Sequence, residues 1–572
     1  MYRPVLDAVG GSLLLTALVA MLPLLVLFVL LGVVRMAAWK AALVSLLVSL
    51  LVAVLAYRMP VGQAVLSGTE GAAFGFFPIL WIVINAIWVY NMTVETGHFD
   101  VLRRSFARVS DDQRIQAVII AFCFGALLEA LAGFGTPVAI TSVMLIALGF
   151  RPLKAATVAL VANTAPVAFG ALAVPITTLA TVSNQSEHAL AQMVGRQTPL
   201  LAVVVPMALV LIIDGARGVR ETLPATLTCG VAFAVAQFVT SNYVSTQLTD
   251  IVAALVGALA VVALLRVWRP ASSYVETDEP ELVPAGGSVG AEAPARRTGG
   301  GDHAPDAGAR SLQEVEARDA AARDTRADVV RAYAPYVVIV LVFVLSQLPG
   351  IKDLLAAKAV NPSFSWPGLH LETAGGKPST LPVFKLGWLG AAGTLMVVSG
   401  LITIPVIGIR PGRALRAYGA TYRQLLPAIV TVMAVLGLAY VMNASGQTAT
   451  LGSWLAGSGA LFALLSPVLG WLGVAVTGSD TSSNSLFGAL QVQAAARTGL
   501  DPLLMAAANS SGGVLGKMVS PQNLAIAAAA VGLSGREGEI FRRVLLWSLV
   551  FLALMCVIVL LQSTPVLSWM VP

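Results

Sequence analysis

Three ionisable side chains lie within long apolar stretches of this 572-residue chain: Glu129, Asp480 and Lys517. A charge at membrane depth is costly, so such residues usually face a partner or a wet cavity. An ammonium group is the natural counter-charge for an anionic substrate, and burial favours the protonated form of a carboxylate. We therefore predict that Lys517 binds an anion and that Glu129 or Asp480 carries a proton; the sequence leaves open which acid titrates. The alternative is a charge at the membrane surface, or a buried pair that serves only packing.

Two segments that contain these residues resemble one another. Gly133 precedes Asn163 by 30 residues, and Gly478 precedes Asn509 by 31. In both copies a glycine and a proline follow the asparagine, seven and twelve residues later. Hydrophobic segments interrupted by Gly and Pro at matching positions of two halves point to the binding site of a secondary transporter. The charged residues are not duplicated between the two copies. The sequence therefore predicts a duplicated backbone scaffold around an asymmetric binding site.

The same segments carry polar side chains that suit a carboxylate or a hydroxyl group. Where a membrane helix is broken, the half-helix N-termini present free N–H groups and a positive dipole end. Each polar side chain either contacts the substrate or caps freed backbone groups, and we expect capping alone for about half of them. Besides Lys517, the predicted substrate-binding residues are Thr136, Asn163, Thr164, Thr481, Ser482, Asn484, Asn509, Ser510, Ser520 and Gln522.

The composition predicts an all-α polytopic membrane protein. Hydrophobic residues make up 57% of the chain and charged residues 11%, whereas a soluble protein carries about twice that charge. Charge-free runs recur, and the run from Gln424 to Ser479 is long enough for at least two spans. With a span taking about 20 residues, we expect about 12–14 spans in all. The three cysteines form no CxxC or His-linked pattern, so no metal, cofactor or disulfide is expected.

Short arginine-rich segments are expected to be cytoplasmic connections between helices. They are Arg103–Arg114, Arg217–Arg220, Arg410–Arg423 and Arg536–Arg543. On this path the first copy is entered from the cytoplasm, whereas the second follows a helix at about Leu425–Met442 and is entered from outside. The sequence therefore predicts two inverted repeats with broken helices.

The chain divides into seven parts on this reading. The segment from Ala271 to Gly308 is rich in Pro, Gly, Ala and charge, which is typical of a disordered linker. The predicted parts are N-terminal membrane helices (1–114), the first repeat core (115–213), connecting helices (214–270), a charged cytoplasmic linker (271–333), membrane helices of the second half (334–443), the second repeat core (444–535) and a C-terminal helix (536–572).

Five motifs in order resemble the bacterial lactate permease family over nearly the whole chain. They lie at Ala126–Ile140, Ala162–Ile176, Gly195–Pro199, Thr477–Asn484 and Gly516–Ile526. The resemblance implies proton-coupled uptake of L-lactate, and often of D-lactate and glycolate, across the bacterial inner membrane. It also implies kinship with ion-transporter folds built from inverted repeats and re-entrant hairpins, some of which work by an elevator motion. The segment Ala271–Arg331 departs from the family by being longer and more charged.

Two other functions compete with a proton-coupled monocarboxylate transporter. An intramembrane aspartyl protease needs two carboxylates held close together, but Asp480 follows Gly478-Ser and lacks the Gly-x-Gly-Asp pattern. A sodium-coupled carboxylate carrier would suit the Ser/Thr/Asn-rich breaks. The expected partners are a small 2-hydroxy acid, protons and membrane lipid, and the sequence leaves open a homodimer.

Overall fold

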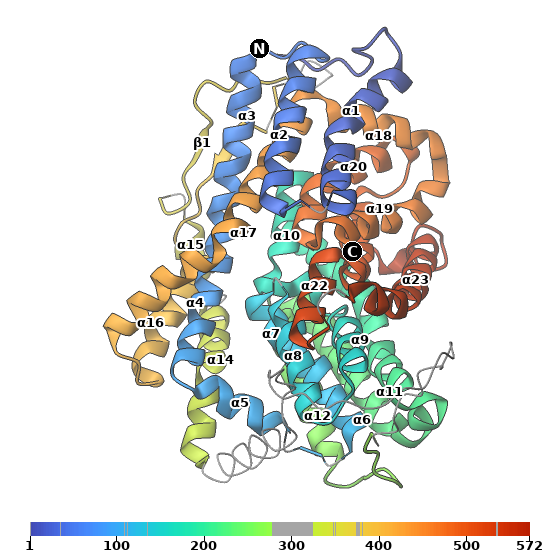
Figure 1. Cartoon of the computed structure of the whole chain (residues 1–572). Helices are drawn as coiled ribbons and strands as arrows, with labels where there is room; N and C mark the ends of the chain where they lie inside the picture. The colour runs from blue at the N-terminus through green and yellow to red at the C-terminus, as the bar shows by residue number, and fades with distance from the viewer. Residues whose placement is uncertain are drawn as a thin grey trace, which may run out of the picture.

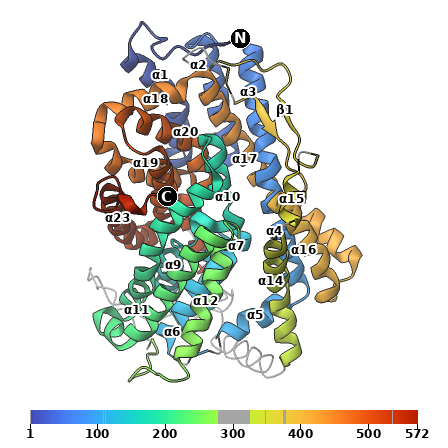
Figure 2. The same cartoon turned by 180° about the vertical axis from the view of Figure 1, so that it is seen from behind.

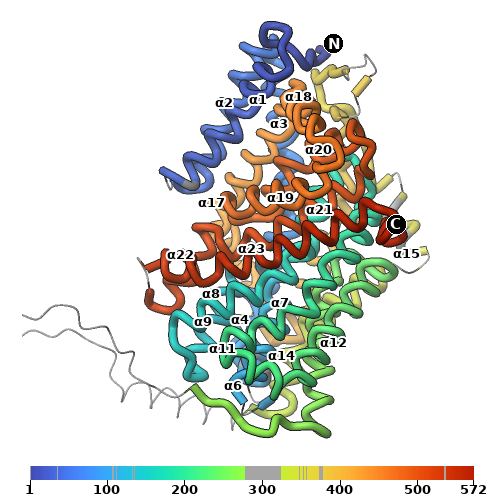
Figure 3. Tube along the Cα trace, turned by 90° about the vertical axis from the view of Figure 1, so that its right-hand side faces the viewer, coloured from blue at the N-terminus to red at the C-terminus, as the bar shows by residue number. Residues whose placement is uncertain are grey.

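A computed structural model describes residues 2–34, 36–107, 109–110, 112–133, 135–276, 324–346, 348, 350–357, 359–372, 378–379, 381–533 and 536–572. Within them the chain is almost entirely helical, with one two-stranded antiparallel sheet of β1 (Ser363–Ser365) and β2 (Val383–Lys385). The long helices run in similar directions from one side of the molecule to the other (Figure 3). Most of the predicted charged linker, residues 277–323, lies outside the described part of the chain.

The helices are long and apolar enough for a multi-pass membrane protein, as predicted. In the described residues nine helices could cross a membrane, or ten if the bent pair Pro152–Ala162 and Val167–Ser183 is one span. The number is lower than the predicted 12–14 for two reasons. The 58-residue stretch Glu187–Val244 counts once, although it turns back on itself at Gly215, and three further apolar helices are shorter, at 10–17 residues each.

The N-terminal helices form an outer layer with a helix from the second half of the chain. This layer contains α1 (Leu13–Phe28), α2 (Ala38–Leu55), α3 (Val61–Phe74) and α17 (Pro411–Ser445), which lie together in Figure 1. Gly71 of α3 faces α17 so closely that a Cβ atom there would lie 2.5 Å from the Leu436 carbonyl oxygen. Small residues at such contacts allow membrane helices to pack backbone to backbone.

A second group of helices flanks this layer and is seen from behind in Figure 2. Its members are α4 (Trp81–Glu95), α5 (His98–Ala107), α14 (Arg326–Ser346), α15 (Ile351–Ala356) and α16 (Ala392–Val406). The segment between α15 and α16 contains the β1–β2 hairpin. Phe384 of β2 packs edge-on against Phe74 of α3, with 6.0 Å between the ring centroids, and so ties the hairpin to the helices.

The first repeat core is a helical hairpin followed by a bent helix pair. Its elements are α6 (Gln113–Ala117), η3 (Val118–Phe124), α7 (Gly125–Ala132), α8 (Thr136–Ala147), α9 (Pro152–Ala162), η4 (Val167–Phe169) and α10 (Gly170–Ser183). The Gln113 side chain at the start of α6 donates to the Leu148 carbonyl oxygen at the end of α8, at 2.6 Å. The chain therefore turns back at the Gly133–Gly135 break, where Gly135 has a φ of 85°. After α9 the helix axis bends by 65° before α10.

The second repeat core has the same order of elements. They are α18 (Gln447–Leu455), η6 (Ala456–Leu461), α19 (Phe462–Thr477), α20 (Asp480–Thr498), α21 (Pro502–Gly516), η7 (Lys517–Val519) and α22 (Pro521–Ala530). The Gln491 side chain of α20 donates to the Ser466 carbonyl oxygen of α19 at 3.1 Å, so these helices run antiparallel from a tip at Gly478. A 3-10 turn separates α21 from α22, in the place that the bend between α9 and α10 occupies in the first core.

The remaining helices surround the two cores. They are α11 (Glu187–Val239), η5 (Thr240–Val244), α12 (Thr249–Leu264), α23 (Glu537–Gln562) and η8 (Ser568–Met570). Helix α21 packs against α19, α11 and α23, and α23 also packs against α9, so the C-terminal helix contacts both cores.

Two arginine-rich segments predicted as connections are mostly helical instead, and one of them is Arg536–Arg543, because α23 begins at Glu537. Arg410–Arg423 is the first part of α17, which begins with Pro411 at its first turn and extends well before the predicted start at Leu425. Proline is favoured there because the first N–H groups of a helix have no intrahelical partner. Arg217–Arg220, by contrast, lies at a connection as predicted: the backbone is non-helical at Gly215 (φ 67°), and α11 turns back there so that Gly230 packs on Val203 and Thr198 donates to Gln237. Composition alone does not distinguish a loop from a helix end that projects beyond the lipid.

Arg114 stabilises one end of the first core through a buried ion cluster. Its side chain is 1% exposed and pairs with Asp112 at 2.8 Å, Asp214 at 2.8 Å and Glu221 at 2.9 Å. We expect Arg114→Gln to lower the free energy of unfolding by about 3–5 kcal/mol, because it leaves buried acids without their cation. Arg217→Gln is the matched control: this side chain is 78% exposed and also contacts Glu221, so we expect little or no loss of stability. Thermal unfolding in detergent measures both, and equal losses would contradict the prediction.

Candidate functional site

A cavity of about 1380 Å³ lies where the two cores meet the outer layer. Elements of both cores line it, together with α17 and the start of α23. We call it the Glu129 cavity. Seven of the predicted site residues are in its wall: Glu129, Thr136, Asp480, Thr481, Ser482, Lys517 and Gln522. The structure therefore brings all three predicted charges to one cavity, although they are far apart in the sequence.

Lys517 and Glu129 form a buried ion pair that joins the two cores. The Lys517 Nζ atom lies 2.5 Å from Glu129 Oε1, and the two side chains are 7% and 4% exposed. Asn163 donates to the other carboxylate oxygen, Oε2, at 3.0 Å. A Cβ atom at Gly170 would lie 2.8 Å from Glu129 Oε1, and one at Gly133 would lie 3.1 Å away. The glycines of the first motif therefore leave room for this carboxylate.

Asp480 begins α20 at the tip of the second hairpin and has different partners. Its Oδ2 atom accepts from the Ser510 hydroxyl at 2.6 Å and from the Asn484 amide at 3.2 Å. Its Oδ1 atom is buried and has no hydrogen-bond partner among the described residues. A Cβ atom at Gly513 would lie 2.4 Å from that oxygen. Glu129 and Asp480 thus bind separate partners and do not form the close pair that an aspartyl protease needs.

Other predicted residues lie behind the cavity wall and hold the breaks together. Asn484 donates to the Pro175 carbonyl oxygen of α10 at 3.1 Å and so links the two cores. Asn509 donates to Asn484 at 2.9 Å, and Gln491 donates to Asn509 at 3.0 Å. Buried amides are satisfied in this way without a substrate. Asn484, Asn509 and Ser510 are therefore support residues for Asp480 and for the core contact.

Thr164 and Ser520 satisfy backbone groups at the breaks. The Thr164 hydroxyl donates to the Val161 carbonyl oxygen. The Ser520 hydroxyl donates to the Lys517 carbonyl oxygen at 2.9 Å and accepts from the Asn523 N–H at 3.4 Å, at the start of α22. These are the contacts that the capping alternative predicts. Neither residue lines the Glu129 cavity.

Comparison with known proteins identifies the family. The sequence model of the family described as L-lactate permease matches residues 16–566. The chain belongs to this family. Its membership confirms the resemblance drawn from the five motifs and makes the chain a transporter and not an enzyme.

Curated relatives align with this chain over nearly its whole length. The L-lactate permease of Bacillus subtilis (strain 168) is 40% identical, covering 99% of this chain and 98% of the relative. Glycolate permease GlcA of Escherichia coli (strain K12) is 40% identical over 98% of this chain and 97% of its own length. The L-lactate permease of the same organism is 39% identical over 98% of both chains.

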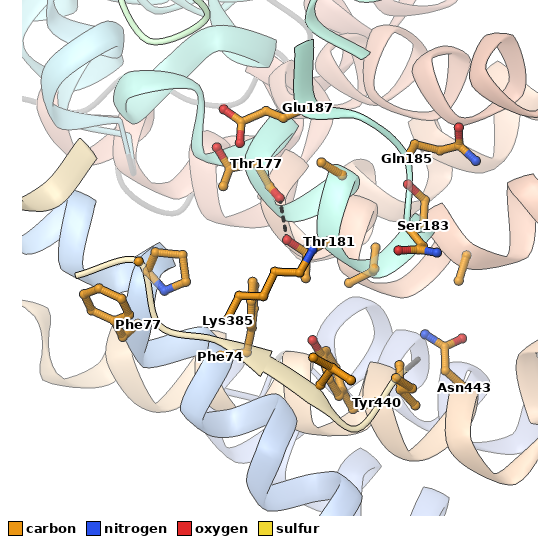
Figure 4. Close-up of a pocket in the computed structure, with 18 of the residues that line it drawn as sticks. Phe74, Phe77, Thr177, Thr181, Ser183, Gln185, Glu187, Lys385, Tyr440 and Asn443 are labelled. Atoms are coloured by element: carbon orange, nitrogen blue, oxygen red, sulfur yellow. Dashed lines mark hydrogen bonds between the residues drawn. The ribbon is translucent and has the colours of Figure 1, made fainter. Parts of the chain in front are cut away.

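A second cavity of the permease, of about 1150 Å³, lies further along the same helices. We call it the Lys385 cavity. Along α10, residues 170–175 line the Glu129 cavity and residues 177–183 line the Lys385 cavity; α17 and α20 are divided in the same way. Figure 4 shows Lys385 of β2 extending towards Thr181, with Glu187 and Thr177 beyond it and Tyr440 and Asn443 on the other wall.

Helices α10 and α20 pack closely beside the Lys385 cavity. A Cβ atom at Gly488 of α20 would lie 2.7 Å from the Leu179 side chain and 2.9 Å from that of Val182, both in α10. The two cavities therefore lie at different levels along helices that are shared by both cores and α17.

Sequence reasoning missed three ionisable residues near these cavities. Lys385 and Glu187 line the second cavity, and Asp250 is fully buried at the start of α12. Each adjoins an apolar run in the sequence rather than lying inside one: Asp250 directly follows the charge-free run Thr222–Thr249, and Lys385 precedes another that begins at Leu386. A search for charges at the ends of such runs would have found them.

Proposed function

We propose that this chain takes up L-lactate, together with D-lactate and glycolate, with protons across the bacterial inner membrane. The relatives named L-lactate permease and glycolate permease support a small 2-hydroxy acid as the substrate. The buried Glu129–Lys517 pair carries the proposal. It offers one cation for a carboxylate and one acid for a proton, in a cavity shared by both cores.

The charges of this pair explain the coupling of substrate to protons. When the substrate carboxylate binds Lys517, it displaces Glu129 from its cation. An ionised carboxylate left unpaired in a buried site costs several kcal/mol, so Glu129 takes up a proton instead. The loaded site then holds one ammonium and one carboxylate, as the empty site did. One substrate anion therefore moves with one proton.

Asp480 suits a different role in this scheme. It has no cation as close to it as Lys517 is to Glu129, and its free Oδ1 atom is buried beside the cavity. A carboxyl in this position stays protonated because the ionised form would be unpaired. A neutral carboxyl both donates and accepts a hydrogen bond, which matches the 2-hydroxyl group of the substrate.

Basic residues indicate which way each cavity opens. Trp39, Gln424 and Glu537 line the Glu129 cavity, and each has a lysine or arginine as its neighbour in the sequence. Under the positive-inside rule this cavity opens to the cytoplasm and the Lys385 cavity to the outside. The open end of the first hairpin, at Gln113 and Leu148, then faces the cytoplasm, and that of the second faces outwards. The cores are inverted repeats in this scheme, and alternating access moves them against the outer layer.

Uptake into proteoliposomes tests the proposed function. We expect labelled L-lactate to accumulate when the outside is made acidic, to be lost with a proton uncoupler, and to be unaffected when sodium is replaced by potassium. Unlabelled D-lactate and glycolate are expected to compete. Accumulation that needs sodium and resists the uncoupler would instead support the sodium-coupled alternative.

A further inference from the structure

Asp250 is a buried acid that the exchange at Lys517 does not use. It is 0% exposed and its Oδ1 atom accepts from the Gln237 amide at 2.9 Å. Its Oδ2 atom is buried without a hydrogen-bond partner among the described residues. An acid with one satisfied oxygen and one bare one is stable only while it holds a proton. Acids of this kind inside membrane proteins commonly belong to proton relays.

The position of Asp250 connects it to both cavities. Helix α12 packs against α7, and the Gln237 amide that binds Asp250 also donates to the Ala165 carbonyl oxygen at 3.5 Å, two residues after Asn163, the partner of Glu129. On its other side, Gln247 lies three residues earlier and donates to Glu187 at 2.8 Å. Glu187 also bonds to Thr177 and lines the Lys385 cavity, where Figure 4 shows the two together.

We propose that Asp250 is the intermediate proton carrier on a path that runs from Glu187 in the Lys385 cavity to Glu129 at the substrate site. This inference rests on the proposed proton coupling. When the substrate displaces Glu129 from Lys517, the Asp250 carboxyl gives its proton to the Glu129 carboxylate. Glu187 then reprotonates Asp250, and the solution in the Lys385 cavity reprotonates Glu187. Each transfer breaks one O–H bond and forms another, so charge and atoms balance.

The proposed path lies on other elements than the contact between α10 and α20. Asp250 lies on α12, which packs against α7 and α10. Several other ionisable groups lie on elements packed against α12. The thiols Cys123 and Cys229 are buried, and Tyr243 of η5 is exposed. Helix α11 carries His188 and Arg196 near its start and Asp214, Arg217, Arg220 and Glu221 around its turn at Gly215, beside Arg114.

The central test is Asp250→Asn in the full-length protein in proteoliposomes. This variant keeps the shape of the side chain and removes its ability to carry a proton. We expect uptake driven by a pH gradient to fall at least about tenfold, as for the loss of a positioned proton-transfer group. Exchange of lactate for lactate needs no net proton movement and is expected to stay within about twofold of wild type. Glu187→Gln should lower gradient-driven uptake in the same direction.

Gln237→Leu separates a proton carrier from a positioning residue. Gln237 bonds to Asp250 and, at 3.5 Å, to the Ala165 carbonyl oxygen in the bend after α9. If Asp250 acts only by anchoring this amide, Gln237→Leu will reproduce the Asp250→Asn defect, and the proposal is wrong. If Asp250 carries the proton, gradient-driven uptake persists in Gln237→Leu and returns in Asp250→Glu.

Two further outcomes overturn the inference. One is gradient-driven uptake by Asp250→Asn at the wild-type rate. The other is equal loss of exchange and uptake in both Asp250→Asn and Asp250→Glu, which would indicate a structural role. A wild-type protein that accumulates no lactate under a pH gradient would contradict the proposed function itself. If the wild type and Asp250→Asn both accumulate lactate under a pH gradient at the same rate, only the relay through Asp250 is contradicted.

Discussion

Lys517→Ala is expected to abolish lactate uptake. Among the described residues, the Lys517 ammonium group is the one cation in the Glu129 cavity wall, and it lies 2.5 Å from Glu129. Its removal takes away the partner of the substrate carboxylate and leaves Glu129 buried without a cation, at a cost of about 3–5 kcal/mol. Uptake should fall by at least about 100-fold, since each 1.4 kcal/mol corresponds to about tenfold. Initial rates of labelled L-lactate uptake, normalised to the amount of protein in the membrane, measure this effect.

A double variant separates loss of binding from loss of the fold. In Glu129→Gln with Lys517→Met both charges are gone, so no buried charge is left unpaired. We expect this protein to reach the membrane and to unfold at a temperature near that of wild type, yet to take up no lactate. Lys154→Met is the matched control. The Lys154 Nζ atom lies 2.8 Å from Glu276 Oε1, and Lys154 does not line the cavity. Wild-type lactate affinity in Lys517→Ala would remove this lysine from the site.

If uptake is coupled to protons as proposed, Glu129→Gln is expected to keep lactate exchange and to lose net uptake. The glutamine mimics the protonated acid and cannot release a proton, so the loaded carrier returns but the empty one does not. Net uptake driven by a pH gradient should fall at least about tenfold, whereas exchange of internal for external lactate persists. The measurement is the ratio of exchange to net uptake in the same vesicles.

Asp480→Asn provides the contrast that assigns the proton to one acid. If Asp480 stays protonated and binds the 2-hydroxyl group, its amide keeps donor and acceptor atoms, and coupling survives with weaker affinity. If Asp480 is the carrier, its variant and not Glu129→Gln will exchange without net uptake. Unchanged pH dependence in both variants would place the proton elsewhere, with Asp250 as the next candidate.

The breaks in the apolar helices were predictable because few residues are tolerated there. Gly133, Gly478 and the paired Asn residues stand in segments where an interrupted backbone needs glycine and polar side chains. The structure places a hairpin tip at each of these glycines. The partners of the polar residues were not predictable in the same way. Asn484 and Ser510 support Asp480, whereas Thr164 and Ser520 cap backbone groups. All four are small polar residues within apolar segments, so the sequence alone does not distinguish these roles.

The amino-acid sequence by itself determined a polytopic helical transporter with two related broken segments and three charges within apolar sequence, because apolar runs, glycines and the charges among them are local properties. Only the tertiary structure decided that Lys517 pairs with Glu129, since this contact joins residues 388 positions apart, and that Asp480 is left to Ser510 and Asn484. It also brought Asp250 towards Glu129 by packing α12 on α7. Which charges meet depends on how the helices pack, and that packing is set by many small contacts along the whole chain.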